Sequence, residues 1–203
     1  MIQSTFEDLP PIFEKIKEHG FAIFDDGDYD LNIIGIRNLN SSRSNLFDDK
    51  MIVAYRLGEK WITEEFIITT DPSSYYLMKE DYKPCAIYYH PQQARGAYKI
   101  GLHRGKYKAL RQHRPVKFWR DGNKDSHLDY GGKVHKDLIY LNIHRSSTRP
   151  EGSHFIDKWS AGCQVFKYAD ERGFKRFMWL CEQQVKSLGY TTFTYTLIAE
   201  GGE

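Results

Sequence analysis

The sequence has little cysteine and no long hydrophobic run. Its 203 residues include three cysteines, Cys85, Cys163 and Cys181, which are odd in number and far apart. Such a set fits neither a disulfide framework nor a Cys-x-x-Cys metal site, and it is typical of a reducing compartment. No stretch approaches the roughly 20 apolar residues that a membrane-spanning helix needs. We therefore expect no integral membrane segment.

The N-terminal residues also lack the features of a secretory signal. They show no basic segment, no apolar segment and no small-residue cleavage site. This absence predicts a soluble protein that is made in the cytoplasm. If its substrate lies in the cell wall or periplasm, phage lysis or a non-classical export route would have to deliver it there.

The composition and the turn signals predict a β-rich globular protein. Hydrophobic residues make up 40% and charged residues 28%, which excludes a disordered chain, and fourteen tyrosines favour strands. Short alternating or β-branched runs, bounded by turn residues, predict strands at 21–24, 31–38, 51–57, 60–70, 86–89, 97–102, 116–120 and 138–144.

Two helices complete this prediction. Residues 10–19 have prolines in the first turn and end at Gly20, which indicates a short helix. The apolar spacing over 174–185 indicates an amphipathic helix that ends before Gly189, and residues 191–199 then read as a closing strand. We expect one α+β domain, mainly β, over residues 1–203. Residues 1–90 would be a strand-rich portion of unassigned role, and 91–203 the catalytic core.

The segment WSAGCQVF, residues 159–166, contains a candidate nucleophile, and IYLNIH, residues 139–144, ends in a candidate base. A cysteine attacks an acyl group as thiolate, so an imidazole must take its proton, and backbone N–H groups must face the oxyanion. The small residues before Cys163 allow a sharp turn, and His144 lies at the end of an expected strand. The alternative is that Cys163 packs as a small buried hydrophobe next to Trp159.

The arrangement His144…Ser160-Ala161-Gly162-Cys163 resembles the catalytic signature of the L,D-transpeptidase family, over about residues 138–166. The resemblance implies a β-rich catalytic domain that acts on peptidoglycan stem peptides. In that family a cysteine attacks the carbonyl of a diaminopimelate residue and releases D-alanine. The acyl-enzyme then passes to an amine, in a transpeptidase, or to water, in a carboxypeptidase or endopeptidase.

Carried onto this chain, the resemblance makes Cys163 the nucleophile and His144 the base. The N–H groups of Gly162 and Cys163 would form the oxyanion hole, and Ser160 would shape the turn. The chain differs from the family pattern at Ala161, Val165 and Arg145, which leaves both transfer and hydrolysis open. The group that orients His144 also stays open among a backbone carbonyl, Ser146 and Asp157.

Residues 92–120 contain nine Lys or Arg and no acid, with aromatic residues interleaved. This pattern is compatible with a non-catalytic module that binds nucleic acid or another anionic ligand, or with a phage or secretion particle component on a related scaffold. It is also compatible with the solvated face of a sheet. For an enzyme, the same charges would attract the carboxylates of a stem peptide. The candidate substrate-binding residues are His103, Arg104, Tyr107, Arg145, Arg149 and Trp159.

Eight histidines raise the question of a metal, but none shows His-Glu-x-x-His or another close ligand spacing. We therefore expect no metal and no cofactor. The sequence leaves the oligomeric state undetermined.

Overall fold

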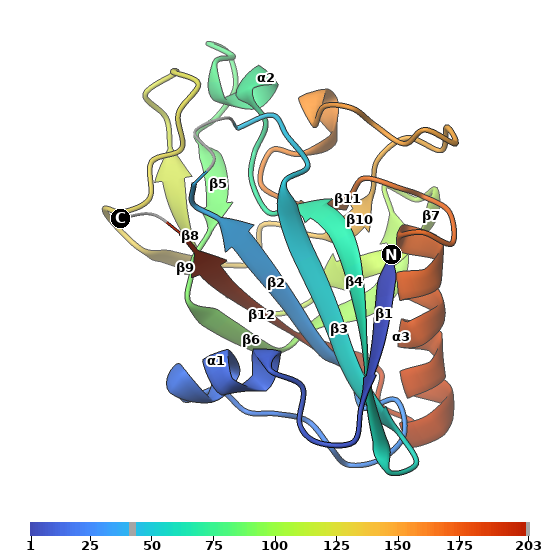
Figure 1. The fold of residues 1–203 in the computed structure, drawn as a ribbon. Helices are drawn as coiled ribbons and strands as arrows, with labels where there is room; N and C mark the ends of the chain where they lie inside the picture. The colour runs from blue at the N-terminus through green and yellow to red at the C-terminus, as the bar shows by residue number, and fades with distance from the viewer. Residues whose placement is uncertain (41–43, 202–203) are drawn as a thin grey trace.

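The computed structural model describes residues 1–40 and 44–201, and it is mainly β, with a long C-terminal helix and a closing strand (Figure 1). The strands are β1 (Ile2–Phe6), β2 (Asn32–Asn38), β3 (Asp49–Leu57), β4 (Lys60–Thr69), β5 (Cys85–Tyr88), β6 (Gln92–His103), β7 (Tyr107–Gln112), β8 (Val116–Asp121), β9 (His135–Asp137), β10 (Ile143–Arg145), β11 (Gln164–Phe166) and β12 (Thr192–Glu200). The helices are α1 (Ile12–Glu18), α2 (Ser74–Leu77), the 3₁₀ turn η1 (Asp157–Trp159) and α3 (Phe174–Leu188).

Within the described residues, nine strands form one sheet in the order β1-β4-β11-β10-β7-β6-β12-β2-β3. Because β3 also pairs with β4 along its whole length, every strand of this sheet except β1 belongs to a closed ring. A second sheet has the order β5-β8-β9. Strands from residues 1–90 and from residues 91–203 therefore share one sheet, for example β2 with β12 and β4 with β11.

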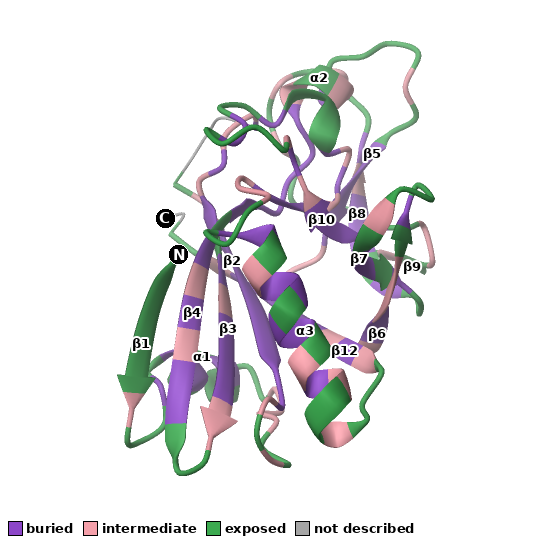
Figure 2. Ribbon diagram, turned by 90° about the vertical axis from the view of Figure 1, so that its right-hand side faces the viewer, coloured by how far each residue is buried: buried purple, intermediate pink, exposed green. Residues whose placement is uncertain are grey.

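The helix α3 lies against the sheet with its apolar side buried and its polar side exposed (Figure 2). Phe177 of this helix contacts the ring of Phe166 on β11, with 4.9 Å between the ring centroids, and the ring of Phe66 on β4. The amphipathic spacing of the sequence is thus explained by burial of one helix face, which is the main source of helix stability in a protein. This packing also fixes the strand that follows Cys163.

The expected helices and the closing strand are confirmed, but two expected strands are absent or shortened. Residues 21–24 form no strand, and of residues 138–144 only the last two lie in β10. Side-chain amides take the place of a strand partner in both segments. Asn32 Oδ1 accepts from the Phe24 N–H, and Gln112 Oε1 accepts from the N–H groups of Ile139 and Leu141. Backbone N–H groups that bond to side-chain acceptors need no neighbouring strand. Such acceptors cannot be recognised from the hydrophobic pattern of the sequence.

Among the described residues, no helix has both the length and the apolar character needed to cross a membrane.

Candidate active site

Parallel pairing of β10 with β11 brings the two candidate catalytic residues together. Ile143 pairs with Gln164, and His144 pairs with Val165. Cys163 directly precedes β11, so it lies at one end of this strand pair. Cys163 and His144 line one cavity.

The turn before Cys163 is built from two small residues. Ser160 Oγ accepts from the Gly162 N–H at 3.1 Å and donates to the Cys163 carbonyl at 2.8 Å. Gly162 has φ of +130°, and a Cβ there would lie 2.1 Å from the carbonyl oxygen of Ala86 on β5. Only glycine fits this position, because the obstacle is backbone and the conformation is left-handed.

The two N–H groups expected to form the oxyanion hole differ in whether they already have a hydrogen-bond acceptor. The Gly162 N–H is used inside the turn by Ser160. The Cys163 N–H has no acceptor within the described part of the chain. A substrate oxygen that approaches the turn therefore meets the N–H of Cys163 and not that of Gly162.

A backbone carbonyl orients His144. Its Nδ1 lies 2.8 Å from the carbonyl oxygen of Arg145. A carbonyl can only accept, so Nδ1 carries the proton and Nε2 is left with its lone pair. The other two candidates have different partners: Ser146 Oγ donates to the Lys167 carbonyl, and an oxygen of the Asp157 carboxylate accepts from Asn45.

A second imidazole stacks on the first. The rings of His103 and His144 are 4.2 Å apart between centroids, with 26° between their planes. The pKa of His144 is lowered to about 3, mainly by burial and next by the neighbouring His103. The pKa of His103 is lowered to about 4, mainly by burial and next by the positive charge of Arg104. Both rings are therefore neutral at pH 7, and two stacked imidazolium ions do not form.

The thiol of Cys163 is also neutral at rest. Burial raises its pKa to about 11, against the opposing effect of the Asn142 N–H. The Sγ atom donates to the Tyr140 carbonyl at 3.6 Å. Cys163 and His144 therefore line the cavity as a neutral thiol and a neutral imidazole, so no thiolate–imidazolium pair is preformed and the thiol proton has to leave as the thiol attacks.

The cavity around Cys163 has a volume of about 330 Å³ and is lined by cations. The positively charged residues are Lys83, Arg104, Arg111, Arg120 and Lys158. None of the described residues that line it is Asp or Glu. Aromatic side chains, among them Tyr82, Tyr140 and Trp159, form much of the remaining wall. The size is that of a small-ligand site.

The structure places only part of the predicted substrate-binding set in this cavity. His103, Arg104 and Trp159 line it. Arg145 lies outside the lining, with its guanidinium 4.1 Å from the ring centroid of Tyr107. Arg149 lines a separate depression with Glu151. The predicted set does not include Lys83, Arg111, Arg120 or Lys158. These residues come from four separate segments, and only the folded chain shows that the segments meet.

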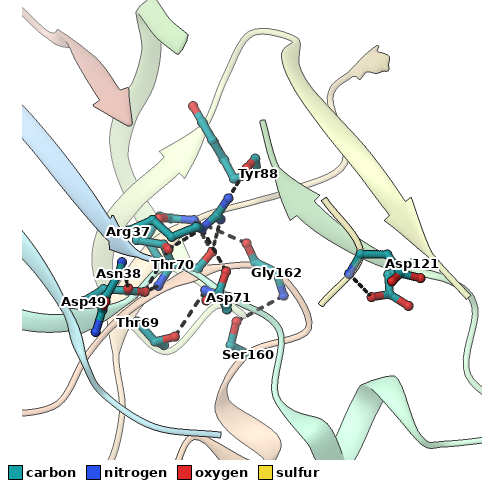
Figure 3. A network of polar contacts seen from close by, with 12 residues as sticks. Arg37, Asn38, Asp49, Thr69, Thr70, Asp71, Tyr88, Asp121, Ser160 and Gly162 are labelled. Atoms are coloured by element: carbon teal, nitrogen blue, oxygen red, sulfur yellow. Dashed lines mark hydrogen bonds and ion pairs between the residues drawn. The ribbon is translucent and has the colours of Figure 1, made fainter. Parts of the chain in front are cut away.

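A buried polar cluster lies behind the turn (Figure 3). Arg37 is fully buried, pairs with Asp71 at 2.9 Å and donates to Thr70 and to the Tyr88 carbonyl. Asp49 accepts from the Thr70 N–H at 2.6 Å and from its hydroxyl at 2.8 Å. Burial, together with the nearby Asp71, raises the pKa of Asp49 to about 7.

Gln164 joins this cluster to the turn that precedes Cys163. Its Nε2 donates to the Thr70 carbonyl at 3.5 Å and to the Gly162 carbonyl at 3.4 Å, and its Oε1 accepts from Tyr195 at 2.8 Å. The sequence offered one signal for this role, a polar residue between Cys163 and two apolar residues of a short strand.

In the described ranges 1–40 and 44–201, no three His, Cys, Asp or Glu side chains gather as a metal-ligand set. No protein-family model, curated protein or solved structure matches this sequence.

Proposed function

We propose that the protein is a cysteine-dependent acyl-transfer enzyme of the L,D-transpeptidase type that acts on peptidoglycan stem peptides. The observation that carries the proposal is that Cys163 and His144 line one cavity, with His144 Nδ1 held by the Arg145 carbonyl. That hydrogen bond leaves Nε2 as the proton acceptor. Transfer to an amine and hydrolysis share every step up to the thioester.

In the first half-reaction, Cys163 Sγ attacks the carbonyl carbon of the donor while His144 Nε2 takes the thiol proton. The S–C bond forms and the carbonyl π electrons move to oxygen, which faces the Cys163 N–H. The tetrahedral intermediate then expels the amine of the leaving residue, which receives the proton from His144. A thioester at Cys163 and a free amine result.

In the second half-reaction, an acceptor amine or water attacks the thioester carbonyl, and His144 takes its proton. The C–S bond breaks, and the Cys163 sulfur recovers the proton from His144. The low pKa of His144 makes its imidazolium a strong acid, which favours protonation of the leaving group. It also makes Nε2 a weak base, so the proton leaves the thiol only as the S–C bond forms.

The alternative of a nucleic-acid-binding module draws support from the basic stretch of residues 92–120. Its arginines, however, lie in two different places. Arg104, Arg111 and Arg120 line the cavity with Cys163, whereas Arg95 and Arg114 line a depression that also contains Asp26 and Asp30. This division favours an anionic ligand in the cavity over a continuous surface for nucleic acid.

The proposal is tested by incubation with purified disaccharide-peptides and mass spectrometry of the products. We expect loss of D-alanine, cleavage of a crosslink or formation of a new one with the wild type, and none with Cys163→Ala. A folded Cys181→Ala variant is the control, because Cys181 lies buried in α3 away from the cavity, and it should keep the activity. His144→Gln should lower the rate about 10²–10⁴-fold.

Absence of any product with every stem peptide, from a folded protein with a reduced thiol, would contradict the cell-wall assignment. Equal products from wild type and Cys163→Ala would contradict the role of the thiol.

A further inference from the structure

The turn before Cys163 offers a developing oxyanion one of its two expected backbone donors. Ser160 Oγ accepts from the Gly162 N–H at 3.1 Å, whereas the N–H of Cys163 meets no acceptor in the described chain. An oxyanion is stabilised by donors that are held in place beforehand, and histidine side chains can supply them as well as backbone N–H groups. A second donor at this site would therefore come from the wall of the cavity.

His103, at the end of β6, lines the same cavity as Cys163 and His144. The preceding Leu102 is 52% exposed and His103 is 8% exposed, in keeping with the alternation of a strand. The ring of His103 contacts the ring of His144, with 4.2 Å between centroids, and the ring of Tyr107, with 5.5 Å. These two contacts limit the rotation of the imidazole, so its nitrogens are held in place.

Asn142 determines which nitrogen of the His103 ring carries the proton. The Gln112 N–H donates to Asn142 Oδ1 at 3.0 Å, which leaves Asn142 Nδ2 facing His103 Nδ1 at 3.5 Å. Two N–H groups would repel each other at this contact, so His103 Nδ1 keeps its lone pair and Nε2 carries the proton. The ring is neutral at pH 7, because burial and then Arg104 lower its pKa to about 4.

The two stacked imidazoles therefore present opposite groups. Neither Nε2 atom has a partner among the described residues, and neither is one of the buried side-chain atoms that lack a partner, so solvent reaches both. His144 Nε2 offers a lone pair, whereas His103 Nε2 offers an N–H. Asn142 links this donor to the nucleophile, because its side chain contacts His103 and its backbone N–H interacts with the sulfur of Cys163.

We propose that His103 is a further catalytic residue, whose Nε2–H donates to the oxyanion that forms when Cys163 attacks an acyl carbonyl. This donor takes the place of the Gly162 N–H and acts together with the N–H of Cys163. The inference rests on the proposed function for the attack by the thiol, but it holds for any acyl donor. A neutral imidazole suits the task, because it donates a hydrogen bond and keeps its proton.

Two reagents distinguish an oxyanion donor from a residue that only positions His144. With p-nitrophenyl acetate, the Cys163 Sγ–C bond forms, the carbonyl oxygen becomes an oxyanion, and the C–O bond then breaks with release of p-nitrophenolate. With iodoacetamide, the Sγ–C bond forms, the C–I bond breaks and iodide leaves, and no oxyanion forms. In both reactions the thiol proton passes to His144 Nε2 and then to solvent. Only the acylation therefore depends on an oxyanion donor.

His103→Phe keeps an aromatic ring and removes the N–H. We expect its acylation rate at Cys163, located by peptide mass mapping, to fall about 10²–10³-fold, while the alkylation rate changes little. His103→Gln keeps a side-chain N–H and should lose less of the acylation rate. His144→Gln should lower both rates, because both reactions need a base for the thiol proton. His113→Phe changes an exposed histidine outside the cavity lining and, as the matched control, should keep both rates.

An acylation rate of His103→Phe that equals the wild-type rate, or that falls only as far as its alkylation rate, would overturn the inference. NMR spectroscopy of the isotope-labelled imidazole nitrogens tests it in the wild type, without a variant. We expect the proton of His103 on Nε2 and that of His144 on Nδ1, and a proton on Nδ1 of His103 would also overturn the inference. Failure of the proposed function has a different signature: acylation of Cys163 by the ester depends on His103, but no stem peptide gives a Cys163-dependent product.

Discussion

Charged side chains occur on both sides of the turn that precedes Cys163, and the two groups differ in whether each charge has a partner. In front, the cavity holds five cations and no carboxylate among its described lining residues. Behind, Arg37 is buried with Asp71, and Asp49 is hydrogen-bonded to Thr70. The front group is exposed or half-buried, and the rear group is almost inaccessible to solvent.

The difference shows that the two groups serve different ends. A buried charge is tolerated only when it is paired and hydrogen-bonded, so the rear cluster stabilises a particular backbone arrangement. An exposed charge needs no partner, so the front group adds little to stability and can attract an anionic ligand. Gln164 connects the two, because it contacts both Thr70 and Gly162.

The largest expected effect on stability comes from the rear cluster. Arg37→Met leaves Asp71 buried without its partner, and we expect the free energy of unfolding to fall by about 3–5 kcal/mol. Arg104→Gln removes an unpaired cation from the cavity and should change it by less than about 0.5 kcal/mol. Urea unfolding of the two variants measures both values. Similar losses in the two would remove the distinction between the groups.

Gln164→Leu should have the next largest effect. The change leaves the buried Tyr195 hydroxyl without its acceptor, which costs about 1–3 kcal/mol of stability. It also releases the Gly162 carbonyl, so kcat should fall while KM changes little. Adding Tyr195→Phe removes the unpaired hydroxyl and should restore stability without restoring kcat. Unfolding curves and steady-state kinetics separate the two effects, and an unchanged kcat in Gln164→Leu would mean that Gln164 does not hold the turn.

The pH dependence of stability should show the raised pKa of Asp49. Its value of about 7 in the folded state lies above the ordinary value of 3.8, so the folded state holds the proton longer as pH rises. This contribution to stability is complete below pH 4 and is lost between pH 4 and pH 7. The unfolding free energy of the wild type should therefore fall relative to that of Asp49→Asn from pH 4 to pH 7. A wild type that gains stability relative to Asp49→Asn over this range would contradict the assignment.

Arg145→Gln should have the smallest effect. Arg145 stacks on Tyr107 outside the cavity lining, so it attracts an anionic donor only from a distance. We expect KM to rise about two- to fivefold at low salt, with kcat unchanged, and the increase to disappear at high salt. Kinetics at two salt concentrations check this. A loss of kcat as large as that of His144→Gln would place Arg145 in the catalytic machinery.

The sequence predicted the β-rich class, α3 and the closing strand, because these depend on local periodicity. A short motif also singled out Cys163 and His144, which the structure brings into one cavity, while their catalytic roles stay predictions. The sequence did not predict Lys83 or Lys158 as cavity residues, since they lie before β5 and in η1 and reach the cavity only through the tertiary fold. It assigned the Gly162 N–H to the oxyanion hole, whereas the hydroxyl of Ser160 accepts that group. Side-chain acceptors for backbone N–H groups leave no pattern in a sequence.

The most direct measurement is the intact mass of the protein during brief incubation with a disaccharide-tetrapeptide. The proposed function predicts an adduct equal to the donor minus free D-alanine, attached at Cys163 and absent from Cys163→Ala. It also predicts that Cys181→Ala forms the same adduct. An adduct that persists in Cys163→Ala, or product formation that never passes through an adduct and continues without the thiol, would contradict it.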